Sequence, residues 1–195
     1  MKFDVAADTP LPDLESLPGV ASVSTPEPRE LDSRYFDSEE YALGRAGYAV
    51  RRRTGGPDEG WHIKGPRDAE GARVELHWPL GAEGEIPDAV TAAVAHVSAA
   101  QLTFIARILN SRIAYYLFDA RGGVVAEFVD DRVTATDVRR DTSATWREWE
   151  FELGPAAPTD ATERSRLLNA ATEAVAAVGG RIAASDSKLG RALGL

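Results

Sequence analysis

The chain contains no cysteine in its 195 residues, so disulfide bonds and thiolate metal sites are excluded. It also lacks any run of about 18 apolar residues, the length that a transmembrane helix needs. The first residues, MKFDVAADTPLPDLE, have no apolar core of the kind found in secretion signals. These absences predict a cytoplasmic protein with no membrane partner.

Basic residues are fewer than acidic residues in this chain. The 22 Lys and Arg residues stand against 31 Asp and Glu residues, which leaves a net charge of -9. Non-specific nucleic-acid binding needs a basic surface that neutralises phosphates, so no nucleic-acid partner is expected. The total does not exclude a small polyanion held in a local basic pocket. Because the chain shows no internal repeat and no convincing linker, we expect one domain over residues 1–195.

What the chain does contain is a succession of alternating segments. Strands are predicted at 48–56, 60–66, 72–80 and 144–154, and a long hairpin is predicted around the turn ARGG within 101–140. A short helix is predicted within 8–20, starting near Pro12, and a short helix or turn at 38–47. Further helices are predicted at 87–100, 160–178 and 185–195, and Asp160 and Glu163 are spaced as in a capping box. The buried stripe of the 160–178 helix is predicted at Leu167, Ala171, Val175 and Val178. Many strands with few helices predict an α+β fold, in which an antiparallel sheet closes or nearly closes on itself.

Alternation also assigns side chains to faces, because successive residues of a strand point to opposite sides. Five sets of charged residues then share a face within their segment: Arg51 and Arg53; His62 and Lys64; Arg73, Glu75 and His77; Glu127 and Asp131; Glu148, Glu150 and Glu152. The simplest interpretation turns them all to water and the apolar residues to the core.

Basic and acidic residues lie on different strands, and this separation favours a second interpretation. The segments at 48–66 are basic and the segment at 144–154 is acidic, whereas a solvated surface more often mixes signs. Charged residues could instead fill the lumen of a barrel, where a bound ligand would have to compensate them. Arginine and lysine suit a polyphosphate, and carboxylates beside them suit Mg²⁺ or Mn²⁺.

Several segments, taken in order, resemble the CYTH family, whose members are also called triphosphate tunnel metalloenzymes. They are YFDSEEYALGRAGYAVRRRTGG, GWHIKGP, RVELHWP, AEFVDDRV, WREWEFEL and SKLGRALG. The resemblance implies a closed antiparallel β-barrel of eight strands, a tunnel that binds a triphosphate with basic side chains and one or two divalent metals with acidic ones. Members hydrolyse inorganic tripolyphosphate or thiamine triphosphate, and a few are adenylate cyclases.

Matching the family motifs carries individual roles onto this chain. The resemblance implies phosphate ligands at Lys2, Arg51, Arg53, Lys64, Arg73 and Lys188, with Arg107 or Arg112 as a further one. It implies metal ligands at Glu75, Glu148 and Glu150, with Glu127, Asp131 and Glu152 as additional acidic candidates. The predicted catalytic residues are Glu148, Glu150 and Arg53. For His62 and His77 we expect hydrogen-bonded structural roles.

The first strand departs from the family pattern. Members open with E-x-E-x-K, and Lys2 matches the lysine, but both glutamates are absent from this sequence, which begins MKF. We therefore expect that the first strand is truncated here and that an E-x-E lies upstream. The alternative is a metal site without these two carboxylates.

Four functions remain open at this stage. The first is Mg²⁺- or Mn²⁺-dependent hydrolysis of a short linear triphosphate. The second is adenylate cyclisation in the same tunnel, and the third is a non-catalytic polyphosphate-binding module. The fourth, a lipocalin-like barrel for an apolar ligand, is disfavoured by the charged faces. A helical, histidine-rich polyphosphate-associated domain, fused or encoded nearby, is an expected partner.

Overall fold

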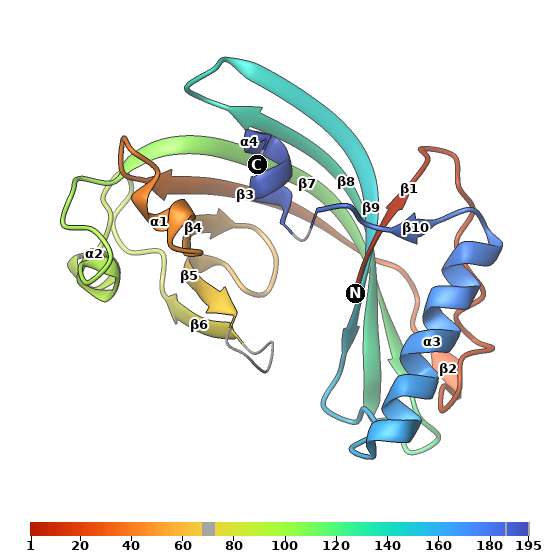
Figure 1. Cartoon of the computed structure of the whole chain (residues 1–195). Coiled ribbons are helices and arrows are strands. Elements are labelled where there is room, and N and C mark those ends of the chain that lie inside the picture. The colour runs from red at the N-terminus through yellow and green to blue at the C-terminus, as the bar shows by residue number, and fades with distance from the viewer. Residues whose placement is uncertain (68–72, 186, 195) are drawn as a thin grey trace. The chain divides into compact units, whose positions relative to one another are not determined.

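A computed structural model describes residues 1–67, 73–185 and 187–194 (Figure 1). Its elements in chain order are β1 (Lys2–Val5), β2 (Ser22–Val23), β3 (Glu27–Asp37), α1 (Ala42–Arg45), β4 (Ala49–Thr54), β5 (Gly60–Arg67), β6 (Arg73–Trp78), α2 (Asp88–Val94), β7 (Thr103–Phe118), β8 (Val124–Asp137), β9 (Thr142–Leu153), α3 (Ala161–Ala177), β10 (Arg181–Ile182) and α4 (Lys188–Leu193). The predicted strands are present, as are the helices predicted after residue 37. The short helix predicted within 8–20 is wrong, because these residues form turns and irregular backbone. The 72–80 and 185–195 predictions fall partly on residues 72, 186 and 195, which lie outside the described ranges.

The described strands form one sheet in the order β10-β1-β9-β8-β7-β3-β4-β5-β6, with β2 paired to β7. The antiparallel α+β class is thereby confirmed, but a closed eight-stranded barrel is wrong in two respects. The sheet has ten strands, of which β2 and β10 have two residues each. Among the described residues no pairing joins the edge strands β10 and β6. Alternation within a strand assigns its faces, but it carries no information about which edges pair.

The chain divides into two compact units. Unit 1 comprises residues 1–29, 110–133 and 145–186, and unit 2 comprises residues 30–109, 134–144 and 187–195. Strands β3, β7, β8 and β9 contribute residues to both units. Each unit has its own hydrophobic core, and the two are described separately below.

In unit 1, helix α3 supplies one side of the core. Leu167, Ala171 and Val175 are buried on one helical stripe, as the sequence predicts. They pack in one cluster with Phe3 of β1 and with aromatic residues of β8 and β9. The helix begins where its N-cap, Asp160, accepts hydrogen bonds from the backbone amides of Thr162 and Glu163 at 2.9 Å each.

A buried ion pair stabilises the same unit. The Arg147 guanidinium donates to both carboxylate oxygens of Asp130 at 2.8 Å, and also to the backbone carbonyl of Thr9 at 2.6 Å. Trp149 Nε1 donates to the same Asp130 carboxylate at 3.1 Å. Arg147 therefore connects β8 and β9 to the loop that follows β1, and hydrogen bonding to Asp130 raises the pKa of the Arg147 side chain.

In unit 2, β3, β4, β5 and β6 form a meander in which each neighbouring pair is antiparallel. Val50, Trp61 and Ile63 point to the side that is covered by a cluster with Leu43 of α1 and Val90 of α2. Helix α2 ends at Val94 and is shorter than the predicted 87–100 helix.

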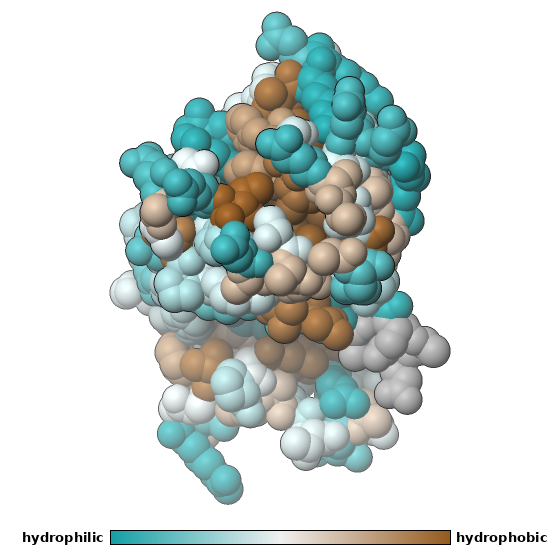
Figure 2. All heavy atoms as spheres, turned by 90° about the vertical axis from the view of Figure 1, so that its left-hand side faces the viewer, coloured by the Kyte–Doolittle hydropathy of each residue, from teal (hydrophilic) through white to brown (hydrophobic). Residues whose placement is uncertain are grey.

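The edge strand β6 leaves apolar side chains uncovered. Val74 is 62% exposed and Leu76 is 39% exposed. Figure 2 shows hydrophobic residues interspersed among hydrophilic ones on one face of the molecule. Apolar and charged residues therefore alternate along β6, but the apolar side chains Val74 and Leu76 are not buried.

We expect Arg147→Ala to lower the free energy of unfolding by about 3 kcal/mol or more, because it leaves the Asp130 carboxylate buried without its cation. Urea denaturation followed by circular dichroism measures the change. Arg166→Ala, at an exposed position of α3, is the control and should change stability by less than about 0.5 kcal/mol. Equal small effects in both variants would contradict a structural role for the Arg147–Asp130 pair.

Candidate functional site

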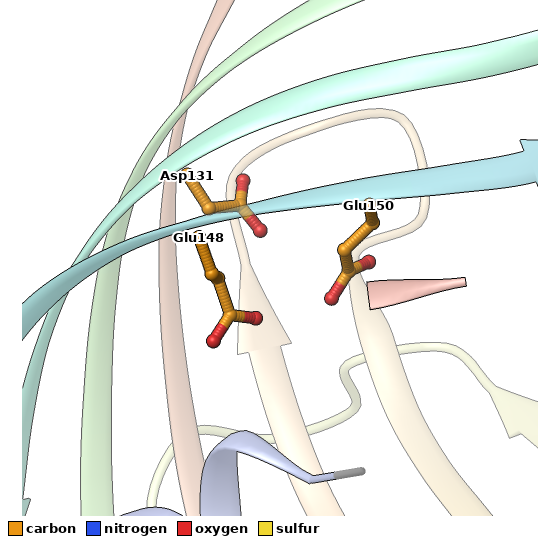
Figure 3. A group of neighbouring side chains, drawn as sticks. All are labelled: Asp131, Glu148 and Glu150. Atoms are coloured by element: carbon orange, nitrogen blue, oxygen red, sulfur yellow. The ribbon is translucent and has the colours of Figure 1, made fainter. Parts of the chain in front are cut away.

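Strand β9 places its carboxylates and its core residues on opposite faces of unit 1. Trp149 and Phe151 enter the core, so the side chains of Glu148 and Glu150 must leave on the other side. Asp131 of the neighbouring strand β8 lies with them. Figure 3 shows the three side chains extending from β8 and β9 toward the same region.

These three residues form an acidic cluster. Each offers a carboxylate oxygen within 4.8 Å of the others. Asp131 is 0%, Glu148 4% and Glu150 6% exposed. Three carboxylates so close together and so little solvated repel each other strongly, and they require positive charge nearby.

Two cations of unit 1 supply part of that charge. Lys2 Nζ lies 2.5 Å from Glu150 Oε1 and 3.5 Å from Glu148 Oε1. Arg112 binds Asp131 through two 2.7 Å hydrogen bonds and reaches Glu150 Oε2 at 3.4 Å. Burial works to lower the pKa of Arg112, but the hydrogen bonds and charge of Asp131 outweigh it and raise that pKa. Lys2 and Arg112 thus bring two positive charges to the three carboxylates.

The donor set fits a hard divalent cation. Mg²⁺ and Mn²⁺ are bound by oxygen ligands, and the cluster presents three buried carboxylates whose oxygens lie within 4.8 Å of one another. Asp131 uses both oxygens to hold Arg112, whereas Glu148 and Glu150 face the single flexible ammonium of Lys2. Glu148 and Glu150 are therefore the residues that would hold the ion, with the Lys2 ammonium moving aside. Trp146 Nε1 donates to Glu148 Oε2 at 2.5 Å and orients it.

The other acidic candidates of unit 1 lie outside this group. Glu152 is exposed at the end of β9. Glu127 accepts a 3.0 Å hydrogen bond from Arg29, which also donates to Tyr116 at 2.5 Å. Sequence reasoning missed Arg29, because the adjoining Pro26 and Pro28 break the pattern of its strand.

Unit 2 carries the predicted basic face. Arg51 of β4 pairs in register with His62 of β5, and His62 pairs with His77 of β6. Arg53 lies two residues beyond Arg51, on the same side. Lys64, two residues beyond His62, shares this side, while Trp61 and Ile63 turn to the core. The assignment of these faces by alternation is therefore correct within the unit.

The two arginines are held by acceptors of unit 2. Arg53 Nη1 donates to Asp58 Oδ2 at 2.8 Å, and Arg53 Nε donates to Ser33 Oγ at 3.3 Å. Arg51 Nη2 lies 3.9 Å from the same Asp58 oxygen. Burial works to raise the pKa of Tyr35. The positive charge of Arg51 and its hydrogen bond to Tyr35, together with the charges of Arg53 and Lys188, outweigh burial and lower that pKa. Lys188 therefore contributes to the positive potential felt by Tyr35.

The remaining predicted ligands of unit 2 are more exposed. Lys64 Nζ binds Glu75 Oε1 at 3.0 Å, and the Glu75 side chain is 57% exposed. Arg107 makes a bidentate contact with Asp32, at 3.1 and 2.7 Å. Arg73 is exposed at the start of β6. Glu75 is thus not one of the three clustered carboxylates, and its role as a metal ligand stays a prediction, as do the roles of Arg73 and Arg107.

Both predicted structural histidines are hydrogen-bonded. His62 Nε2 lies 2.8 Å from the Asp58 carbonyl oxygen, and His77 Nε2 lies 3.1 Å from the Glu59 carbonyl oxygen. Burial, followed by the charge of Arg51, lowers the pKa of His62 from 6.5 to about 4. The His62 side chain is therefore neutral at pH 7. A neutral ring can hydrogen-bond to the Asp58 carbonyl oxygen without adding a third positive charge next to Arg51 and Arg53.

Within the described part of the chain, no helix is both long and apolar enough to traverse a lipid bilayer. Residues 1–171 match the sequence model of the CYTH domain. The chain is 35% identical over 205 residues to the uncharacterised protein Rv2226 of Mycobacterium tuberculosis strain H37Rv, and equally to MT2285 of strain CDC 1551. It aligns over 99% of its own length and spans 39% of the length of these relatives.

Two solved structures share the fold. One is bh2851 of Bacillus halodurans, a candidate adenylate cyclase, with a TM-score of 0.52 and 17% identity over 84% of this chain and 82% of that one. The other is PH1819 of Pyrococcus horikoshii OT3, with a TM-score of 0.52 and 12% identity over 99% and 96%. At these identities the likeness shows the fold alone.

If the acidic cluster binds a metal, Glu150→Gln should weaken Mn²⁺ binding by at least about tenfold. Loss of an outer-shell partner alone commonly costs 10–100-fold in metal affinity, and this change removes a ligand charge. Titration calorimetry with Mn²⁺, without any substrate, measures the effect. Glu152→Gln, two residues further on the same face, removes the same charge outside the cluster. An equal loss in both variants would show non-specific electrostatics and contradict the assignment.

The neutral state of His62 predicts a pH dependence of stability. Between about pH 6.5 and pH 4, His62 is mostly protonated in the unfolded chain but mostly neutral in the folded chain. Lowering the pH over this range therefore favours unfolding. The free energy of unfolding should therefore fall over this range as the pH is lowered, and it should fall less steeply in His62→Gln. Urea unfolding at pH 7, 6, 5 and 4 measures both slopes. His96→Gln, at an exposed position, should keep the wild-type slope.

Proposed function

Because this chain belongs to the CYTH domain family, we propose that it binds a short linear triphosphate and hydrolyses it with a divalent metal ion. Inorganic tripolyphosphate and thiamine triphosphate are the substrates that the family resemblance favours. The observation that carries the proposal is the acidic cluster, in which three buried carboxylates each offer an oxygen within 4.8 Å of the others. Grouped carboxylate oxygens of this kind are the ligands that Mg²⁺ and Mn²⁺ prefer.

Unit 2 supports the phosphate part of the proposal. The side chains of Arg51 and Arg53 are 13% and 12% exposed, so their charges are little screened by water. Their guanidinium groups can each donate two parallel hydrogen bonds to phosphate oxygens. Lys64 and Lys188 add compact charges that suit a polyphosphate with several non-bridging oxygens. We assign to these four cations the neutralisation of the triphosphate chain.

The proposed reaction is a hydrolysis in which a water oxygen attacks a terminal phosphorus in line with the bridging oxygen. The new P–O bond forms as the P–O bond to the bridging oxygen breaks, and the bond electrons stay on the leaving pyrophosphate. The attacking water loses one proton, which a carboxylate side chain would accept as general base. Bound metal would supply Lewis-acid stabilisation of the phosphate oxygens. The contribution of the protein is charge placement, which is what phosphoryl transfer chiefly requires.

The M. tuberculosis relatives are much longer than this chain, so any activity of such whole proteins is a further proposal. A helical polyphosphate-associated domain remains the expected partner. Such a domain would hold a long polyphosphate and present its end to the hydrolytic site.

Arg53→Ala should lower kcat/KM for tripolyphosphate by about 10²–10³, because it removes one cation that stabilises the transition state. Phosphate release from tripolyphosphate, thiamine triphosphate and ATP, each with Mg²⁺ and Mn²⁺, measures the activity. Arg52→Ala is a matched control, since Arg52 is the same residue type on the opposite face of β4. Its kcat/KM should stay within about threefold of the wild type.

Three results would redirect the proposal. Full activity of Arg53→Ala would remove this residue from the site. Release of pyrophosphate and cyclic AMP from ATP would identify a cyclase. Tight tripolyphosphate binding without phosphate release, in the presence of either metal, would identify a non-catalytic binding module.

A further inference from the structure

The hairpin loop between β4 and β5 carries an acidic residue into the basic face of unit 2. Asp58 Oδ2 lies 2.8 Å from Arg53 Nη1 and 3.9 Å from Arg51 Nη2. A single carboxylate oxygen therefore stands between the two guanidinium groups that we assign to phosphate binding. The Asp58 side chain is 48% exposed, whereas both arginine side chains are nearly buried.

The arginine pair needs a counter-charge when no anion is bound. Two like charges close together with little access to water destabilise the folded chain unless an opposite charge compensates them. Asp58 provides that charge. Burial works to raise the pKa of Asp58, but the charges of Arg53 and Arg51 outweigh it and lower that pKa, so the carboxylate is ionised at neutral pH. Among the described residues the buried Arg51 Nε has no hydrogen-bond partner.

The backbone of the loop fixes the position of this carboxylate. The carbonyl oxygens of Asp58 and Glu59 lie within hydrogen-bonding distance of His62 and His77. At the two ends of the loop, Gly55 and Gly60 have φ angles of +78° and +146°. A Cβ at Gly55 would lie 2.0 Å from the Glu30 carbonyl oxygen, so the close turn requires glycine there.

We propose that Asp58 is an internal counter-anion for Arg51 and Arg53, which an incoming phosphate group must displace. The inference rests on the proposed function, and it adds that the affinity for triphosphate is set by competition with a residue of this chain. A phosphate oxygen that binds Arg53 Nη1 takes the place that Asp58 Oδ2 holds. The displaced carboxylate, already half exposed, turns outward into water at small cost.

The change in anion affinity on removal of Asp58 distinguishes a competing role from a positioning role. If Asp58 only positioned the arginines, its removal would disorder them and weaken anion binding. If Asp58 competes with the anion, its removal frees donors and deletes a like charge next to the bound phosphate. At a partly exposed site, the Coulomb repulsion between the Asp58 carboxylate and a phosphate group about 4 Å away is large enough to change the affinity by about tenfold.

The test is calorimetric titration of the full chain with tripolyphosphate in EDTA, so that no metal and no turnover contribute. Asp58→Asn should bind about tenfold more tightly than the wild type, and the gain should shrink in 1 M salt, where charges are screened over about 3 Å. Glu59→Gln removes the same charge from the neighbouring loop position and should change the affinity less than about twofold. Asp58→Glu, which restores the charge, should return the affinity toward that of the wild type.

The outcomes separate the two proposals. Wild-type binding with equal or weaker binding by Asp58→Asn would overturn the counter-anion role and leave the proposed function standing. An equal gain in Asp58→Asn and Glu59→Gln would also overturn it, because net charge alone would then explain the effect. Absence of binding by the wild type and by every variant in EDTA would overturn the counter-anion role. The proposed function, which includes a divalent metal ion, is tested separately by phosphate release with Mg²⁺ and Mn²⁺.

Discussion

Charge compensation in little-hydrated surroundings is the constraint on which the site of this protein depends. Strand β9 must turn Trp149 and Phe151 to the core, so its alternation sends Glu148 and Glu150 to the opposite face. There they meet Asp131, and Lys2 and Arg112, bound among the three carboxylates, reduce their mutual repulsion. The same constraint acts in unit 2, where two arginines share one aspartate.

Both charged groups are therefore occupied by partners from the same chain. In the acidic cluster Lys2 binds Glu150, and Arg112 secures Asp131. On the basic face Asp58 binds Arg53, at the place that we propose for a phosphate oxygen. Ligand binding in either unit would exchange one ion pair for another. Affinity then depends on the difference between two interactions, and not on the total charge of the face.

Strand faces, the long hairpin, the Asp160 cap and the buried stripe of α3 followed from sequence, because each depends on residues near one another along the chain. The shared face of Glu148 and Glu150 followed for the same reason. The closed eight-stranded barrel was wrong, since pairing of strand edges is set at long range. Asp58 was missed because its significance lies in a contact with Arg53 across a hairpin loop, and no spacing rule marks it.

The sequence by itself determined the family, the antiparallel class and the side of each strand on which the charges lie. A period of two residues and an ordered set of motifs contain that information. Only the tertiary structure decided that Asp131 completes the acidic cluster while Glu75 pairs with Lys64, and that Arg112 binds Asp131 while Arg107 binds Asp32. These choices depend on which strands lie side by side and in which register, and that is settled by the packing of the whole sheet.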